Sequence, residues 1–581
     1  MTLRILGAIC CVIATEVNGS PKDASYRLRT DVVPIHYDIA LTYDTEKPIP
    51  GPYPATTVIK FKVLSDGVNS FDVHADRLLI DSITLTDQNF ENIPLQQHDA
   101  NTDQQTLTLA TLDGTALAKN ELHTIRIDYS YQVQQRAGIL KNGIFQTEGF
   151  YIATTFEFDL ARSMFPNFDE PSFKATFNLS IDVSHRDNKD QVHRAVSNMP
   201  VLSMSSTPGR TQTAFEKTPI MSSYLVTIAI PRMGIQVQTS AKDSPRSTLY
   251  NYEEQQLTAD KVREVVLLFD DMFGVKNPLP KVDYLVEEPV GYAIENWGAI
   301  FGNSRAYIHE VAHNYFGDLV TCSWWEELWL NEGLTTYAAT LALTPLGIAN
   351  TSKTLIGGSS FVARFYQRAP NSLVGHYYPR PNGAAYQKGR AIARMVGALV
   401  GGQERFIQLL GKYLKKYAYS NADTEDFIET MVGDTVLWAD RIRDWIYQLG
   451  GPTLHIAFDS MSQRFVFRQQ SAVSGRRDVW NVPIFYRISG EAKERLTIFP
   501  KPLNDQAHYS LAIVRGKQPR DYTFNPDFIV PMLIETEFNE EFSYPNVEST
   551  SGFAVGDKND DNDLTMPPMK DILQREAQYI P

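Results

Sequence analysis

Four residues have the types and the spacing of a hydrolytic metal site. His309 and His313 stand four positions apart, so a helix would place both imidazoles on one face, one turn above the other. Glu310 lies between them, and Glu332 follows nineteen positions after His313, which leaves room for a turn and a second helix. Two histidines and one carboxylate, with a position left for water, form a typical ligand set of zinc hydrolases. The pattern predicts zinc-assisted hydrolysis of an amide.

The alternative is a surface helix that carries two solvated histidines and a carboxylate. A buried imidazole, by contrast, needs a polar partner, and a metal ion is the simplest one that this pattern offers. The residues around the motif are mostly apolar and favour burial: Ala306, Tyr307, Val311, Ala312, Tyr315 and Phe316. We therefore expect one Zn²⁺ per chain, held by His309, His313 and Glu332.

The metal motif lies between regions of different hydrophobic periodicity. Residues 21–240 alternate with period two, which predicts a large antiparallel β domain. Residues 241–450 change to helical spacing, which predicts a mainly helical catalytic domain around the motif. The positions that carry these interpretations are Tyr37, Ile39, Leu41, Tyr43, Ile125, Ile127, Tyr129, Tyr131, Val133, Phe177, Leu179, Ile181 and Val183 for the strands, and Val262, Val265, Val266, Phe269, Ile392, Met395, Val396, Leu399, Phe406, Leu409, Leu410, Tyr413, Leu414 and Tyr417 for the helices.

The helical pattern ends at Gly450-Gly451-Pro452. Alternation returns after it, so we expect a small β-sandwich over residues 451–537. Residues 538–581 are rich in aspartate and predict a disordered acidic tail. The expected fold class is therefore multidomain α+β.

Length and charge limit the possible functions. At 581 residues the chain is too long for a single core. Apolar content of 43% and charged content of 21% are ordinary for a globular protein. The net charge of −14 argues against nucleic acid as a partner, and there is no polybasic membrane patch.

The first residues resemble a secretory signal. Arg4 precedes an apolar run over residues 5–14, and small residues follow, so we expect a signal peptide over residues 1–20. Ten apolar residues are too few to cross a bilayer. Removal of this segment would take Cys10 and Cys11 with it and leave Cys322, which we expect to be a buried apolar residue without a disulfide.

These features predict a protein that is secreted or held at the extracellular face of the cell surface, with peripheral association as one form of attachment. The sequence shows no glycolipid-anchor signal. The triplets at Asn178 and Asn350 are permissible N-glycosylation sites, so we expect a glycoprotein.

Further segments carry a family resemblance. Ala293-Ile294-Glu295-Asn296-Trp297-Gly298 precedes the metal motif, and Tyr386-Gln387-Lys388-Gly389 follows it. Two more, at residues 26–37 and 161–171, lie in the expected β domain. Together these segments resemble the aminopeptidase N family of zinc aminopeptidases (gluzincins), in the right order over residues 25–500. The resemblance implies a thermolysin-like catalytic domain. It does not extend to the family's large helical C-terminal domain.

The resemblance also implies roles for individual residues. The three ligands named above match the family's zinc ligands, and Glu310 matches the general base that takes a proton from the attacking water. Tyr386 matches the tyrosine that stabilises the oxyanion. Glu295 matches the glutamate that binds the free α-amino group of the substrate, and Ala293 and Asn296 are assigned to substrate binding by the same motif.

The sequence also departs from the family. The motif Gly-Ala-Met-Glu-Asn has Tyr292 in place of the glycine and Ile294 in place of the methionine, and Tyr292 is expected to narrow the cleft. Only twelve residues separate Asn296 from His309. We therefore expect that the strand after the motif is missing and that the metal helix begins near Asn303 or Ser304.

Other losses affect the same site. The glutamine that commonly follows Thr154-Thr155 and assists in binding the amine is absent, and the segment between Glu332 and Tyr386 is short. A truncated or mis-spliced product and a naturally reduced paralogue would both give such a pattern.

Three functions follow from these observations. The leading one is a zinc aminopeptidase that removes N-terminal residues from peptides with a free N-terminus. The alternative is a catalytically impaired family member that acts as a zinc-bearing peptide-binding or interaction protein, which the short connector and Tyr292 favour. A third is hydrolysis of another substrate, such as a lipid epoxide, which the Glu295-Asn296-Trp297-Gly298 sequence disfavours.

Overall fold

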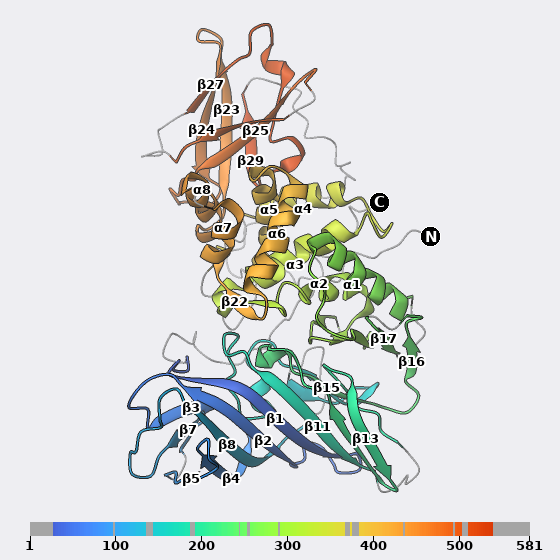
Figure 1. Ribbon diagram of the computed structural model, residues 1–581. Helices are drawn as coiled ribbons and strands as arrows, with labels where there is room; N and C mark the ends of the chain where they lie inside the picture. The colour runs from blue at the N-terminus through green and yellow to red at the C-terminus, as the bar shows by residue number, and fades with distance from the viewer. Residues whose placement is uncertain are drawn as a thin grey trace, which may run out of the picture.

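The fold is described from a computed structural model, in which three regions follow one another along the chain (Figure 1). The predicted signal segment, with Cys10 and Cys11, and the predicted acidic tail lie outside the described residues. The described residues are 27–96, 99–134, 143–185, 192–242, 245–251, 256–288, 291–366, 372–374, 383–433, 436–491, 494–501 and 509–537. No helix among them is long and apolar enough to cross a membrane.

The first region is built on an eight-stranded sheet, drawn in blue to green in Figure 1. The alternating residues predicted for its core are all buried, which confirms the period-two interpretation. In sheet order, the strands are β13 (Val201–Thr207), β14 (Arg210–Phe215), β11 (Thr176–Ser184), β1 (Val32–Asp44), β2 (Tyr53–Val63), β8 (Leu122–Tyr131), β4 (Leu79–Thr86) and β5 (Asn92–Ile93).

The prediction that this domain is antiparallel is wrong at one place. β1 and β11 pair in parallel, with His36 opposite Thr176, whereas the other pairs of this sheet are antiparallel. Alternation in the sequence tells which face of a strand is buried, but it carries no information about the direction of the neighbouring strand.

Two smaller sheets complete the first region. One has the order β12 (Val196–Ser197), β15 (Ile228–Pro231), β10 (Phe150–Thr155) and β9 (Gly143–Phe145), and the other has the order β3 (Ser70–His74), β7 (Thr106–Ala110) and β6 (Asp99–Asn101). β10 matters for function, because it leads into Glu157, which lies against the second region.

The second region combines helices with a five-stranded sheet. The sheet order is β16 (Gln236–Thr239), β17 (Thr248–Asn251), β18 (Asp283–Val286), β20 (Ala299–Gly302) and β19 (Ala293–Ile294). The helices are α1 (Ala259–Phe273), α2 (Tyr307–His313), α3 (Trp329–Ala342), α4 (Thr351–Phe365), α5 (Gly383–Leu399), α6 (Gln403–Tyr417), α7 (Thr424–Val432) and α8 (Val436–Tyr447). The apolar stripes predicted to be helical lie on α1, α5 and α6, and their residues are buried apart from Leu399 and Tyr417, which are partly buried.

The last region holds two sheets. Aromatic rings connect them: Phe465 and Phe467 of the first sheet contact Tyr522 and Phe524 of the second, with centroids 4.9–5.4 Å apart. The first has the order β27 (Tyr509–Ala512), β24 (Arg464–Ser471), β23 (Pro452–Asp459) and β29 (Leu533–Thr536), and the second β26 (Arg495–Phe499), β25 (Val482–Ile488) and β28 (Tyr522–Phe524).

Candidate active site

The two histidines lie on a short helix, α2, which begins two residues before His309 and ends at His313. The Asn303 side chain accepts a hydrogen bond from the Arg305 amide, a short 3-10 turn follows, and α2 then runs from Tyr307 to His313. The predicted start of the helix near Asn303 is confirmed. Both histidines and Glu310 are buried, so the surface-helix alternative is wrong.

The expectation that the strand after the Glu295 motif is missing is also wrong. β20 follows it directly and pairs with β19, with Ala293 opposite Gly302. A tight turn makes this possible, in which the Ala299 amide donates to the Asn296 carbonyl over 2.9 Å. The short connector therefore forms a hairpin, and this hairpin holds Glu295 beside α2.

The three expected zinc ligands converge. The Nε2 atoms of His309 and His313 are 3.0 Å apart, and each lies 3.3 Å from Oε2 of Glu332 on α3. Donor atoms bonded to zinc at 2.0–2.1 Å in tetrahedral geometry lie about 3.3 Å from one another. The residues present therefore fit a zinc ion in both donor type and spacing.

A second layer of contacts orients these ligands. Nδ1 of His313 lies 2.9 Å from the Phe316 carbonyl and 3.3 Å from the Thr335 hydroxyl. A proton on Nδ1 that is donated to the Phe316 carbonyl leaves the Nε2 lone pair for a metal. Burial favours the neutral form of Glu332, but the interaction with His313 and the contacts with both histidines bring its pKa down to about 2, which favours the ionised form that a metal ligand needs.

A second cluster of buried side chains lies beside the three expected ligands and shares His313 with them. Carboxylate oxygens of Glu295 and Glu310 and a ring nitrogen of His313 all lie within 4.8 Å of one another. All three residues are buried, and among the described residues Oε1 of Glu295 has no hydrogen-bond partner. Burial raises the pKa of the Glu295 carboxyl.

Glu157 is a site residue that the sequence analysis missed. It follows β10 in the first region, is buried, and interacts electrostatically with Glu295, Glu332 and Glu310. Burial, and then the charge of Glu295, raise its pKa well above the ordinary value. Glu157 stands two positions after Thr155, and the amino-acid order alone does not show that its side chain reaches the site.

Asp318 is a further buried carboxyl near these groups. Among the described residues, neither of its carboxylate oxygens has a hydrogen-bond partner, and burial and then Glu295 raise its pKa well above the ordinary value. The Lys174 ammonium, from the first region, donates to the carbonyls of Asp318 and Leu319 over 3.3 and 3.4 Å.

The remaining expected residues have different environments. Tyr386 is buried near the start of α5, with its ring 6.1 Å from the His309 ring. Asn296 donates to the Thr154 carbonyl over 3.1 Å and lies 3.2 Å from the Thr227 hydroxyl, so it connects the hairpin to the first region. Ala293 is buried within β19.

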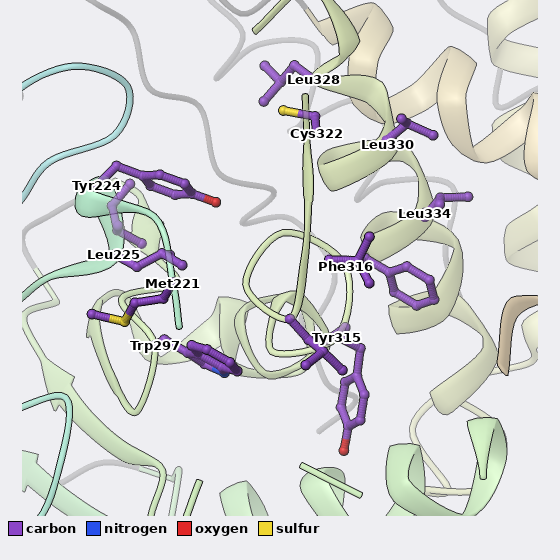
Figure 2. Close-up of a cluster of buried hydrophobic side chains, with 14 of the residues drawn as sticks. Met221, Tyr224, Leu225, Trp297, Tyr315, Phe316, Cys322, Leu328, Leu330 and Leu334 are labelled. Carbon is purple, nitrogen blue, oxygen red and sulfur yellow. The ribbon is translucent and has the colours of Figure 1, made fainter. Parts of the chain in front are cut away.

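An apolar contact between the first two regions supports the site. Met221, Tyr224 and Leu225 from the first region lie opposite Trp297, Phe316 and Cys322 of the second (Figure 2). The Tyr224 hydroxyl donates to the Gly317 carbonyl over 3.0 Å. Cys322 is buried and free, as predicted, and burial raises its pKa well above the ordinary value.

Sequence comparisons agree with this geometry. The family described as "Peptidase M1 N-terminal domain" matches residues 33–225, and the "Peptidase family M1 domain" matches residues 304–357 and 381–443. Aminopeptidase M1-A of Oryza sativa subsp. japonica is 30% identical over 440 residues, which cover 69% of this chain and 46% of the relative. Glutamyl aminopeptidase of Sus scrofa is 30% identical over 394 residues, covering 60% of this chain and 40% of the relative.

A third relative shows similar partial coverage. Probable aminopeptidase 2 of Sulfurisphaera tokodaii is 28% identical over 411 residues, which cover 63% of this chain and 50% of the relative. The chain thus spans about half the length of the curated relatives that it matches. The matched domains, the converging ligands and the surrounding carboxyls lead to one conclusion: the chain belongs to the M1 family of peptidases, the aminopeptidase N family that its motifs resemble.

Proposed function

We propose that this chain is a zinc-dependent aminopeptidase that hydrolyses N-terminal residues from peptides. The observation that carries the proposal is the convergence of the three ligand atoms within 3.3 Å, beside a separate group of buried carboxyls. The relatives named as aminopeptidases support the same reaction.

His309, His313 and Glu332 would hold the zinc ion. Bound there, zinc would polarise the scissile carbonyl and lower the pKa of water. Glu310 is close enough to the ligands to take a proton from the attacking water and to pass it to the leaving amine. Tyr386, whose ring lies 6.1 Å from that of His309, would donate its hydroxyl proton in a hydrogen bond to the developing oxyanion.

Glu295 and Glu157 would select a free N-terminus. Burial resists the ionisation of two neighbouring carboxyls, and a substrate ammonium supplies the positive charge that favours it. An internal peptide bond carries no such charge and would leave the buried carboxyls without a counter-charge. This difference would restrict cleavage to the first residue of a peptide.

Glu310→Gln tests the reaction. We expect the variant to keep one zinc per chain and to lose about 10²–10⁴-fold in kcat on an aminoacyl-coumarin. Zinc is measured by atomic absorption and turnover by fluorescence on the same sample, with a chelator as a further control. A wild-type chain that binds zinc and peptide without turnover would instead support the peptide-binding alternative.

We propose that the chain is secreted, or peripherally attached at the extracellular face of the cell, and that it carries a glycan at Asn350. Asn350 is exposed and caps α4 through its oxygen, which leaves its nitrogen for a sugar, whereas Asn178 donates to Asp38 within the sheet over 2.7 Å. The test uses the chain secreted from eukaryotic cells and treated with a peptide N-glycosidase. Asn350→Gln should abolish the loss of mass that the enzyme causes, and Asn178→Gln should leave that loss of mass unchanged. The reverse result would contradict this assignment.

We propose that the chain divides into a thermolysin-like catalytic domain over residues 241–450, a β domain before it and a β-sandwich over residues 451–537. The ring contacts between the last two sheets support the sandwich.

A further inference from the structure

Two glycines bring the backbones of α3 and α5 into direct contact. A Cβ atom placed on Gly333 of α3 would lie 2.7 Å from Cα of Gly389 on α5 and 3.0 Å from the Ala385 carbonyl oxygen. A Cβ atom on Gly389 would lie 2.7 Å from Cα of Gly333. Both obstacles are backbone atoms, so a rotamer change cannot relieve the overlap, and one helix has to move.

This contact joins the metal ligand to the residue proposed to hold the oxyanion. Gly333 directly follows Glu332, and Gly389 lies three positions, or nearly one helical turn, after Tyr386. Ala385, whose carbonyl closes the contact, directly precedes Tyr386. Because the Tyr386 ring also lies against the His309 ring, the spacing of the two helices sets the distance from Tyr386 to the metal.

Two other helical glycines lack such a backbone contact. Gly357 of α4 would place a Cβ atom in open space, and Gly397 of α5 would meet the Phe406 side chain at 3.2 Å. Gly411 of α6 has a backbone contact of its own, with the Phe273 carbonyl oxygen 2.3 Å from its Cβ position, but the contact at Gly333 and Gly389 directly adjoins Glu332 and lies about one turn from Tyr386.

We propose that Gly333 and Gly389 are positioning residues that set Tyr386 at the distance from the metal where its hydroxyl reaches the oxyanion. The inference rests on the proposed aminopeptidase function. A methyl group at either position would separate α3 from α5, and a misplacement of about 1 Å costs about 10²-fold in rate. Because all three zinc ligands lie on α2 and α3, a displacement of α5 should leave metal binding unaffected.

The test uses Gly389→Ala and Gly333→Ala, each with and without Tyr386→Phe, and Gly357→Ala as the matched control. We expect each glycine variant to lower kcat by about 10²-fold with an unchanged KM and one zinc per chain. Tyr386→Phe should lower kcat by about 10²–10³-fold, and adding a glycine substitution should lower it no further. Gly357→Ala should match the wild type.

A binding measurement separates this inference from the proposed function. An aminophosphinic dipeptide presents tetrahedral oxygens in place of the oxyanion, and calorimetry measures its affinity without turnover. Gly389→Ala and Tyr386→Phe should weaken it by the same factor, even if the wild type proves inactive on peptides. Three results would each overturn the positioning role. The first is a double variant whose loss in kcat is the product of the losses of the glycine and the tyrosine substitution. The others are loss of zinc from the glycine variants and failure of both glycine variants to fold.

Discussion

The proposed metal end and the proposed amine end of the candidate site are built in different ways. His309, His313 and Glu332 come from two consecutive helices within one stretch of 24 residues, and contacts inside the second region orient them. The proposed amine end combines Glu157 of the first region with Glu295 of the second, and Asp318 interacts electrostatically with Glu295. The proposed metal site is therefore local, whereas the proposed recognition of the amine depends on how two regions pack.

Glu295→Gln and Glu157→Gln should give the largest contrast between the two ends. We expect Glu295→Gln to lower kcat/KM by about 10²-fold, because a buried charged contact to the substrate is lost, while zinc stays at one per chain. Glu157→Gln should follow with a smaller loss. The measurements are aminoacyl-coumarin kinetics and metal analysis. Loss of zinc from either variant would show that the two ends are not separate.

Asn198→Ala should weaken the amine end through the contact between the regions. Asn198 is buried, donates to the carbonyls of Leu225 and Trp297 over 2.7 and 2.9 Å, and accepts from the Thr227 amide. We expect the free energy of unfolding to fall by about 1–3 kcal/mol. Because Trp297 lies in the hairpin that carries Glu295, kcat/KM should also fall, by about tenfold.

Urea unfolding and steady-state kinetics measure these two effects. Asn69→Ala, at an exposed position, is the matched control and should change neither. An unchanged kcat/KM in Asn198→Ala at full zinc occupancy would mean that this contact supports the fold without supporting the site.

Lys174→Met should change the pH dependence of stability. Burial lowers the pKa of Lys174 to about 7 in the folded chain, so the unfolded chain binds more protons between pH 7 and the ordinary lysine value. The wild type should therefore gain stability as pH rises from 7 to 9, and Lys174→Met should lack this part of the gain.

The measurement is the difference in unfolding free energy between wild type and variant at pH 7 and pH 9. Lys353→Met, at an exposed position, is the control. A difference that stays constant over this range would mean that Lys174 keeps its proton between the two regions.

The sequence was most informative where function depends on residues close together in the chain. The spacing of His309 and His313 predicts one helical face, and the apolar neighbours predict burial; the structure confirms both. The period-two residues of β1, β8 and β11 are buried as predicted. Each of these properties follows from the geometry of a single element, which a local pattern encodes.

Two of the errors concern contacts between distant segments, and one concerns a local turn. The parallel pairing of β1 with β11 and the position of Glu157 depend on which distant segments meet in space, whereas β20 pairs with its neighbour β19. The short connector between Asn296 and His309 suggested a missing strand. The number of residues in the connector does not show that a tight turn between Asn296 and Ala299 leaves room for β20.

The amino-acid order alone determined the ligand types, the burial of the metal helix and the family resemblance, because each depends on residues a few positions apart in the chain. Tertiary structure decided that the three ligand atoms meet within 3.3 Å, that Glu157 joins Glu295, and that Gly333 contacts Gly389. The physical reason is that periodicity orients a side chain relative to its own helix or strand. The distance between two elements is set by the side chains, or the absence of side chains, packed between them.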